Sequence, residues 1–325
     1  MPEPWSPTLE TFPPPWYPHL AMTTIDITKR PPDDVPLPPL DQPGPRNVPT
    51  ATIRHVADEL RLDITEMLCR AASGHPGGSF SAANIIATLF LDEMRHRPSD
   101  PTWGDRDRFV LSKGHCVPAL YAILARLGYF PRHELWTLRQ LGSRIQGHPA
   151  NLLCPGIEAS TGSLGQGLSV ALGMALAAKL DAPGKDPRFR VYCLTGDGEI
   201  QEGQIWEAAM SAPRHKATNL TVLVDCNQGQ IDGLVKDVLD LEPLADKWKS
   251  FNWNVLTIDG HDIDQIKLAC AAARKETARP TAVLCRTHKG HGASLFEKDL
   301  VGWHGKTPTR AEADQVIAEI TGRLS

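Results

Sequence analysis

The 325-residue sequence has no strong excess of charge of either sign, no long hydrophobic run and no closely spaced pair of cysteines. Its net charge of −4 provides no electrostatic footprint for nucleic acid or for an anionic membrane. No apolar stretch approaches the length of a membrane-spanning helix, and the first residues lack the basic-then-apolar order of a signal peptide. We therefore expect a cytoplasmic protein that binds a small molecule or another protein, with no nucleic acid or membrane partner.

The seven cysteines are odd in number and include no Cys-x-x-Cys pair. This usage is typical of free thiols in a reducing compartment. Several of them lie in apolar runs such as VYCLTG (191–196) and AVLCRT (282–287), where a cysteine behaves as a small hydrophobic residue. We interpret all seven as free thiols without a chemical role.

Proline is concentrated at the start of the chain, in TFPPPWYPHL (11–20) and KRPPDDVPLPPLDQPGP (29–45). Such a composition is incompatible with helix or interior strand, so residues 1–48 are expected to form an extended, largely unpacked tail. A proline-rich recognition arm is the alternative, and Met22 is an alternative start of translation. One domain is expected to occupy residues 49–325.

From residue 51 onward, strand-like and helix-like segments alternate. Nearly continuous apolar runs predict strands buried on both faces at residues 108–112, 189–196, 219–227, 252–260 and 280–288. Apolar residues at helical spacing predict helices at residues 51–72, 81–94, 117–128, 167–180, 204–215, 243–251 and 262–275. The alternation indicates an α/β fold with a doubly wound, mainly parallel sheet flanked by helices.

Two loops that follow predicted strands carry candidate ligand-binding residues. TGDGE (195–199) places Asp197 between two glycines, and DCNQGQIDG (225–233) places Asn227 after the next strand. Ligands of such sheets bind at the carboxyl ends of the strands, so the two loops belong to one rim. Carboxylate and amide oxygens suit Mg²⁺ or Ca²⁺, and glycines let phosphate oxygens approach backbone N–H groups. Gly-Asp-Gly alone is usually a tight turn, but the following Asn227 favours a site for a divalent metal and a diphosphate.

This pairing of Gly-Asp-Gly with a later asparagine resembles the signature of thiamine diphosphate enzymes. Seven further landmarks resemble those of transketolases, in the same order, and together they cover nearly everything after the proline-rich tail. They are SGHPGGS (73–79), DRFVLSKGH (107–115), QGHP (146–149), STGSLGQGLS (160–169), GDGEIQEGQIWEA (196–208), QIDG (230–233) and GWHGKTPT (302–309).

The resemblance is specifically to the N-terminal, diphosphate-binding subunit of a split transketolase. The sequence ends where a full-length transketolase would continue into its pyrimidine-binding domain. The resemblance implies thiamine diphosphate and Mg²⁺ as cofactors, with Ca²⁺ or Mn²⁺ as alternatives. It also implies a C-terminal partner subunit in an α2β2 assembly, and transfer of a two-carbon ketol unit between sugars or sugar phosphates.

The same resemblance assigns roles to individual residues. The implied metal ligands are Asp197, Asn227 and the carbonyl of Gly229. The implied catalytic histidines are His75, His115, His148 and His304. The implied cofactor-binding residues are His115, Gly162, Ser163, Leu164, Gly196, Asp197, Gly198, Glu199, Asn227 and Ile231. Carboxylates at a subunit interface are implied for Glu202 and Glu207.

Other interpretations of these residues remain open. In THKGHG (287–292), His291 stands where the family usually has the second lysine of Lys-Gly-Lys-Gly, which leaves the charge at this position open. A histidine next to glycine or proline is often a turn residue, and Glu202 suits a helix N-terminus. We interpret the remaining histidines, including His19, His96, His133 and His215, as structural. At the level of the whole chain, the alternatives are the alpha subunit of a 2-oxo-acid dehydrogenase, a truncated deoxyxylulose-phosphate synthase and a non-catalytic regulatory subunit that retains the fold.

Overall fold

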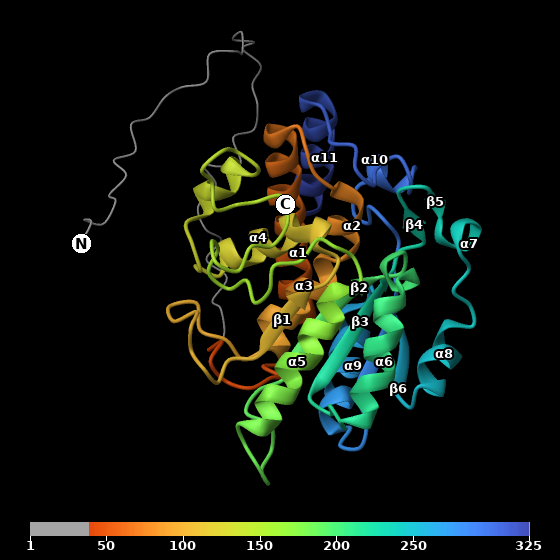
Figure 1. The fold of residues 1–325 in the computed structure, drawn as a ribbon. Helices are drawn as coiled ribbons and strands as arrows, with labels where there is room; N and C mark the ends of the chain where they lie inside the picture. Colours follow the sequence, from red (N-terminus) through yellow and green to blue (C-terminus); the bar gives the residue numbers. More distant parts are fainter. Residues whose placement is uncertain (1–38, 325) are drawn as a thin grey trace, which may run out of the picture.

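The computed structural model describes residues 39–324, and the rest of the predicted tail lies outside these residues. Its centre is a five-stranded, fully parallel sheet in the order β1-β2-β3-β7-β6 (Figure 1). The strands are β1 (Arg108–Leu111), β2 (Val191–Gly196), β3 (Leu220–Cys226), β6 (Asn254–Asp259) and β7 (Thr281–Arg286). A small antiparallel hairpin pairs β4 (Gly229–Gln230) with β5 (Gly233–Leu234). The predicted α/β fold with a parallel sheet is confirmed.

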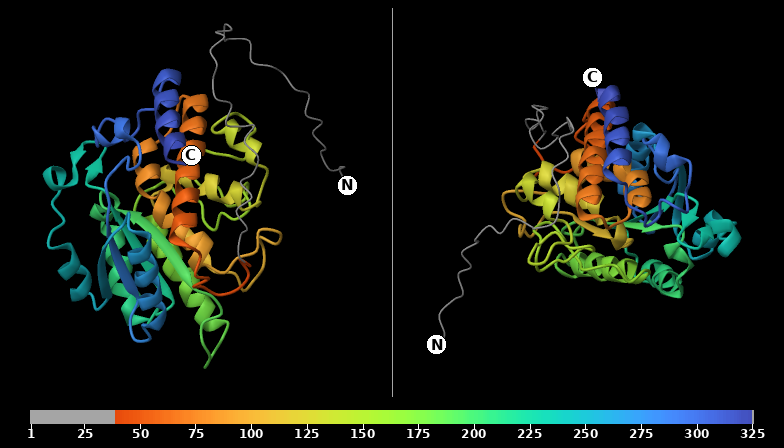
Figure 2. Two further views of the ribbon diagram at one scale, coloured as in Figure 1. Left: turned by 180° about the vertical axis from the view of Figure 1, so that it is seen from behind. Right: turned by 90° about the horizontal axis from the view of Figure 1, so that it is seen from above.

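Helices cover both faces of the sheet (Figure 2). The long ones are α1 (Thr50–Ala71), α4 (Val117–Arg126), α5 (Gln166–Leu180), α6 (Gly203–Arg214), α9 (Ile263–Lys275) and α11 (Arg310–Leu324). The shorter helices are α2 (Pro76–Ser81), α3 (Ala83–Thr88), α7 (Val235–Val238), α8 (Leu244–Ser250) and α10 (Ser294–Glu297). A π-helical turn, η2 (Leu89–Glu93), and the 3-10 turns η3 (Gly114–Cys116), η4 (Arg132–Thr137) and η5 (Glu199–Gln201) complete the secondary structure.

Alternating side chains of each strand feed two separate hydrophobic cores. In β2, Tyr192 and Leu194 enter the core formed with α1, α3, α4, α9 and α11. Val191 and Cys193 point to the opposite face, into the core formed with α5, α6 and α8. Successive strand residues face opposite sides of a sheet, so a strand covered on both faces is apolar along its length. This is the physical reason for the continuous apolar runs in the sequence.

Residues 39–48, which composition assigns to the tail, pack against the domain. The Arg46 guanidinium donates to the backbone carbonyl of Leu91 at 3.1 Å, and the Val48 N–H donates to the Asp92 carboxylate at 2.7 Å. An arginine can satisfy the carbonyls left free at a helix C-terminus, which proline content does not reveal. The packed domain therefore starts before residue 49.

The seven cysteines are all free thiols, as the sequence predicts. Six are buried, and only Cys69, on α1, is partly accessible. Within residues 39–324 we find no helix that is both long enough and apolar enough to cross a membrane.

Acid pH is expected to destabilise the fold in part through His96. This buried ring bonds the Tyr129 hydroxyl and the Phe90 carbonyl, both at 2.9 Å, and burial lowers its pKa from 6.5 to about 4. Between these values the unfolded chain binds one more proton than the folded chain, so stability falls as the pH drops through this window. In urea titrations at pH 4.5 to 6, His96→Gln should lower the slope of unfolding free energy against pH by about 1.4 kcal/mol per unit. The exposed His133→Gln is the control, and equal slopes in both variants would contradict the assignment.

Candidate functional site

The loops after β2 and β3 meet at the carboxyl edge of the sheet. These strands are parallel neighbours, with Gly196 paired with Asp225. Asp197 and Asn227 follow directly, and both line one pocket of about 220 Å³. Two segments separated by a whole helix and strand are thereby joined into one site.

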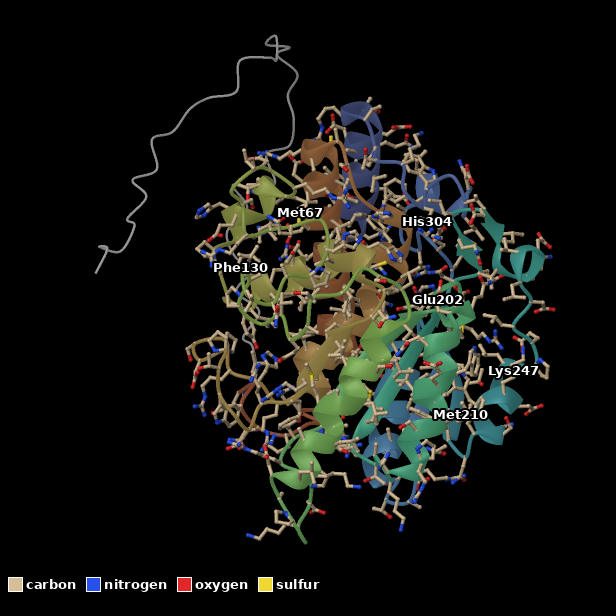
Figure 3. The ribbon with its side chains drawn as sticks, in the orientation of Figure 1. Met67, Phe130, Glu202, Met210, Lys247 and His304 are labelled. Atoms are coloured by element: carbon tan, nitrogen blue, oxygen red, sulfur yellow. The ribbon has the colours of Figure 1, made fainter. Side chains whose placement is uncertain are left out.

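The pocket gathers eleven of the residues singled out in the sequence. They are His115, Leu164, Gly196, Asp197, Gly198, Glu199, Glu202, Asn227, Gly229, Ile231 and His304. Its wall is completed by Lys113, Gln201, Gln230, Asp232 and Lys289. Figure 3 shows Glu202, at the start of α6, below His304 on the same side of the molecule.

The other predicted residues do not line this pocket. The His75 ring lies beside it, with its centroid 5.1 Å from that of His115 and 5.5 Å from that of His304. The His148 ring lies so close to Gly162 that a Cβ at this glycine would come within 2.8 Å of it. Ser163 is exposed on the loop before α5, and Glu207 is exposed on α6.

The Asp197 carboxylate is held in place by the two loops. One oxygen accepts from the Gly198 N–H at 2.9 Å, and the other accepts from the Gln228 N–H at 2.6 Å. Gln228 has a φ of +70°, which a residue with a Cβ rarely adopts. Burial raises the pKa of Asp197 to about 6. The two backbone hydrogen bonds do not fully offset the cost of burying the charge of Asp197. Its carboxylate is therefore suited to binding a cation.

Asn227 and Gly229 present oxygen atoms beside Asp197. The Asn227 amide oxygen accepts only a long bond from the Gly229 N–H, at 3.3 Å, while its amide nitrogen donates to Asp225 at 2.8 Å. A Cβ at Gly229 would lie 2.8 Å from the Leu300 carbonyl oxygen, so no larger residue fits without a shift. Carboxylate, amide and carbonyl oxygens are the ligand types that Mg²⁺ prefers.

A buried lysine connects the loop after β3 to the histidines; this loop, residues 227–233, carries the candidate metal ligands Asn227 and Gly229 and is called the metal loop below. The Lys289 ammonium donates to the Gly229 carbonyl and contacts Nδ1 of His304, both at 2.6 Å. Burial lowers the pKa of Lys289 to about 8, which leaves it mainly charged at neutral pH. The pocket is thus lined by a buried cation, the kind of group that an anionic ligand requires.

Three imidazoles form a cluster beside the pocket, and two of them, those of His115 and His304, line it. The rings of His115 and His304 stack at 5.2 Å, and His75 meets both edge-on. Burial lowers the pKa of His75 to about 4 and that of His304 to about 3, and places that of His115 well below its ordinary value. The pKa of His148 is also lowered by burial. At neutral pH these rings are neutral and can each donate one hydrogen bond and accept another.

Glu199 shapes the rim of the pocket because both oxygens of its carboxylate accept hydrogen bonds from other protein groups. Its oxygens accept from the Ser112 hydroxyl at 2.5 Å and from the Gly165 and Gly196 N–H groups at 3.0 Å. Burial raises its pKa. The contacts tie together the ends of β1 and β2 and the start of α5, so this side chain shapes the pocket.

Two buried polar atoms around the pocket have no hydrogen-bond partner in the described part of the protein. They are Oε1 of Gln230 and Nδ1 of His75. Unpaired buried polar atoms are costly and are rarely left so. At Gly198 the backbone lies close to the Gln230 side chain, and an added Cβ would be 3.1 Å from it. The close approach and the two unpaired atoms fit a pocket that binds a polar ligand.

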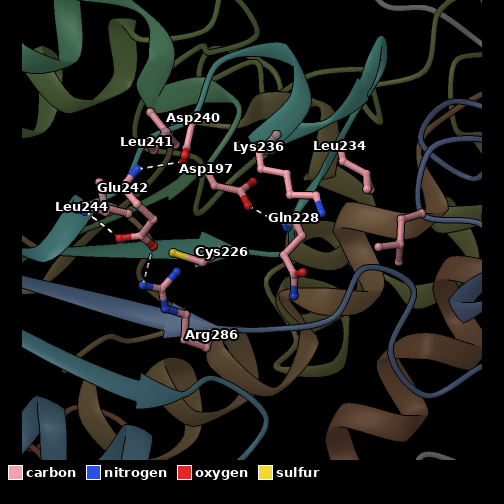
Figure 4. A pocket seen from close by; sticks show the side chains of 12 residues that line it. Asp197, Cys226, Gln228, Leu234, Lys236, Asp240, Leu241, Glu242, Leu244 and Arg286 are labelled. Carbon is pink, nitrogen blue, oxygen red and sulfur yellow. Dashed lines mark hydrogen bonds and ion pairs between the residues drawn. The ribbon is translucent and has the colours of Figure 1, made fainter.

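A second hollow of about 210 Å³ lies behind the Asp197 loop (Figure 4). Asp197 and Gln228 form part of its lining, and its far side carries the Arg286–Glu242 ion pair at 2.8 Å. Both members of that pair are about half exposed, so we assign the pair no role in the site.

His291, where the family usually has a lysine, is outside the main pocket. Its ring stacks on His261 with centroids 3.6 Å apart, and burial lowers its pKa to about 4. This position therefore carries no positive charge at neutral pH.

Sequence reasoning missed three charged residues of the site region: Lys113, Asp225 and Lys289. Lys113 and Lys289 lie in quoted motifs and line the pocket, but a lysine next to glycine carries no sign that it is buried. Asp225 precedes Asn227 by two residues and is fully buried. Its position at the end of an apolar strand is the signal that could have revealed it, because an acidic residue there requires internal partners.

The fold and the pocket define an α/β domain with a polar pocket at the carboxyl edge of a parallel sheet, where ligands of such folds bind. A family model described as "Transketolase, thiamine diphosphate binding domain" matches residues 52–320. The 6-deoxy-6-sulfo-D-fructose transketolase subunit SqwG of a Clostridium species is 42% identical over 268 residues, which are 82% of this chain and 96% of that protein. One subunit of the apulose-4-phosphate transketolase of Phocaeicola vulgatus is 38% identical, over 84% of this chain and 95% of that protein.

Solved structures agree with these sequence matches. Transketolase from Leishmania mexicana superposes with a TM-score of 0.78 at 32% identity, over 84% of this chain and 41% of that one. Transketolase from Campylobacter jejuni gives a TM-score of 0.77 at 33% identity, over 85% and 43%. The chain belongs to the transketolase family, and it is of the N-terminal subunit type that contains the thiamine diphosphate-binding domain.

Proposed function

We propose that this chain binds Mg²⁺ and the diphosphate of thiamine diphosphate, and that it transfers ketol units only together with a C-terminal subunit. The observation that carries the proposal is the pocket that joins Asp197, Asn227 and Gly229 beside three neutral histidines. Asp197, Asn227 and the Gly229 carbonyl would hold the metal. The Lys289 ammonium and the Gly198 backbone would face the diphosphate.

Thiamine diphosphate, when bound, supplies the carbanion chemistry by which a two-carbon ketol unit leaves a ketose and joins an aldose. The histidines of this chain would orient the substrate and handle its protons. Because Nδ1 of His304 accepts from the Lys289 ammonium, the proton of the neutral ring is on Nε2. Nε2–H of His304 can therefore donate to a substrate oxygen as negative charge develops on it.

The partner subunit would cover the open side of this site. Leu164 and Ile231 line the pocket, yet 36% and 65% of their surfaces are exposed. Val170 on α5 and Met210 on α6 are exposed to 40% and 56%, and Met210 follows Glu207 closely in the sequence. Apolar side chains around a functional pocket favour a protein partner. We propose the C-terminal subunit with the pyrimidine-binding domain as that partner, in an α2β2 assembly in the cytoplasm.

The substrates are proposed to be sugars with an anionic terminal group. The two subunit relatives are named for a sulfonated ketose and for a ketose phosphate. Both substrates have a charged end distant from the ketol unit, which is the part exchanged in the reaction. Sulfo-sugars and sugar phosphates are therefore the first panel to test.

The proposed function predicts that neither subunit transfers ketol units by itself. The chain and a cognate C-terminal subunit should be assayed separately and then mixed, with Mg²⁺ and thiamine diphosphate, across sulfonated and phosphorylated ketoses and aldoses. We expect turnover only in the mixture, with a 2:2 complex seen by light scattering. Turnover by this chain alone would refute the need for a partner. A 2:2 complex that binds the cofactor but is inactive on the whole panel would favour the regulatory alternative.

A further inference from the structure

Asp225, at the end of β3, is a fully buried carboxylate to which four side chains donate hydrogen bonds. Its Oδ2 accepts from the Ser81 hydroxyl at 2.6 Å, from the Asn227 amide at 2.8 Å and from the Lys113 ammonium. Its Oδ1 accepts from the Thr287 hydroxyl. The carboxylate has no exposed surface, so all of its hydrogen bonds are made within the protein.

The four donors come from four different parts of the fold. Ser81 ends α2, the helix that His75 precedes, and Lys113 lies two residues before His115. Asn227 follows β3, and Thr287 follows β7. The Lys113 ammonium also donates to the Gly78 carbonyl at 3.1 Å. Asp225 is thus the point at which the metal loop is connected to both histidine-bearing segments.

The contact with Asn227 determines which way its amide faces. A carboxylate can only accept hydrogen bonds, so the amide nitrogen of Asn227 must face Asp225. The amide oxygen is thereby directed to the other side, where it accepts the 3.3 Å bond from the Gly229 N–H and borders the pocket. The reversed amide would bring two oxygens together and leave a buried carboxylate with one donor fewer.

Asp225 is charged but is not free to bind a metal itself. Its two oxygens are occupied by the Lys113 ammonium and by the three other donors. Lys113 provides a full counter-charge to it, with both side chains buried. Asp197 lines the pocket, whereas Asp225 does not line it and lies behind Asn227.

We propose that Asp225 is a positioning residue for the divalent metal site, which holds the amide oxygen of Asn227 toward the metal and fixes the metal loop to the histidine cluster. This inference rests on the proposed function, because it assumes that Asn227 binds the metal. The inference adds Asp225 to the proposed metal site as a residue that would itself touch neither metal, cofactor nor substrate. Groups that orient the ligands of a metal typically change its affinity by about 10- to 100-fold when they are removed.

The test is the Mg²⁺ dependence of thiamine diphosphate binding, measured by calorimetry on the full chain assembled with its partner. Asp225→Asn should raise the half-saturating Mg²⁺ concentration at least about tenfold, and saturating Mg²⁺ should restore binding. The matched control is Asp107→Asn. Asp107 is also buried and accepts from the Arg95 and Arg190 N–H groups, both at 2.8 Å, but it precedes β1 at the opposite edge of the sheet. The Asp107→Asn variant should have a lower melting temperature and an unchanged Mg²⁺ requirement for thiamine diphosphate binding.

Thr287→Val provides a second, milder variant that keeps the carboxylate and the shape of the side chain. It removes the donor to Oδ1 and should raise the half-saturating Mg²⁺ concentration about threefold, which is less than the about 10- to 100-fold expected when the orienting group itself is lost. The proposal is overturned if folded Asp225→Asn needs no more Mg²⁺ than Asp107→Asn. It is equally overturned if Asp225→Asn does not fold and Thr287→Val behaves as wild type. If the wild-type assembly binds thiamine diphosphate without any divalent metal, the proposed metal site itself is refuted, which separates that failure from a failure of Asp225 alone.

Discussion

Replacement of Asp197 by alanine should abolish Mg²⁺-dependent binding of thiamine diphosphate, with a loss of affinity of more than about 100-fold. The substitution removes the buried carboxylate that accepts hydrogen bonds from both pocket loops, and it also frees the Gln228 N–H, whose residue has a positive φ. The fold should persist, because a carboxylate whose pKa is raised to about 6 by burial does not stabilise the core. Calorimetry with the assembled protein measures the affinity, and a thermal melt checks the fold.

Asp232→Ala is the matched control for this experiment. Asp232 lines the same pocket but is exposed, and its removal should change the cofactor affinity by no more than a small factor. If Asp197→Ala retained the affinity of wild type, Asp197 would have to be removed from the site. If both variants lost affinity equally, the general negative charge of the pocket would be the cause and not a metal ligand.

His75→Ala should lower the rate of ketol transfer by about 100- to 10,000-fold while leaving the affinity for thiamine diphosphate nearly unchanged. His75 lies outside the cofactor pocket but within 5.5 Å, between ring centroids, of both His115 and His304. Its Nδ1 is buried and has no hydrogen-bond partner among residues 39–324, and its pKa is lowered to about 4, so it is a neutral group able to exchange a proton with substrate. Single-turnover rates and cofactor titrations of the assembled enzyme separate the two effects.

His261→Ala controls for the loss of a buried imidazole as such. Burial also lowers the pKa of His261, to about 3, but its ring stacks on His291, away from the pocket. This variant should lose stability and keep its rate once it is saturated with cofactor. A rate loss in His261→Ala as large as that in His75→Ala would show that structural damage, and not chemistry, explains both.

The fold could largely be predicted because strands and helices here follow their hydrophobic patterns. All five predicted strands are found, since burial on both faces makes strands such as β3 apolar along their whole length. Four α-helices within residues 39–324 were not foreseen: the one-turn helices α7 and α10, and the helices α2 and α11. The sequence of α2 contains proline and two glycines, which are typical of a turn, and α11 begins with the polar run RAEADQ. Both form because their buried faces pack on α1 and its neighbours, which no local pattern encodes.

The candidate site could be predicted only as far as its residues lie in compact motifs. Asp197, Asn227 and the histidines adjoin glycines that mark them, and the structure gathers most of them at one rim. The partners of Asp225 lie 144 and 112 residues away in the sequence, at Ser81 and Lys113. A buried charge network between distant segments depends on tertiary structure, and each member alone looks like an ordinary polar residue.

The burial of six cysteines links oxidative damage in this protein to its unfolding. In the native state oxidants and thiol reagents can reach only Cys69, and burial raises the pKa of that thiol, which keeps little of it in the reactive thiolate form. The other six become available only when the two cores on either side of the sheet open. Irreversible thiol chemistry therefore accumulates in proportion to the time a molecule spends unfolded, and an intact thiol content is a record that the domain has stayed closed.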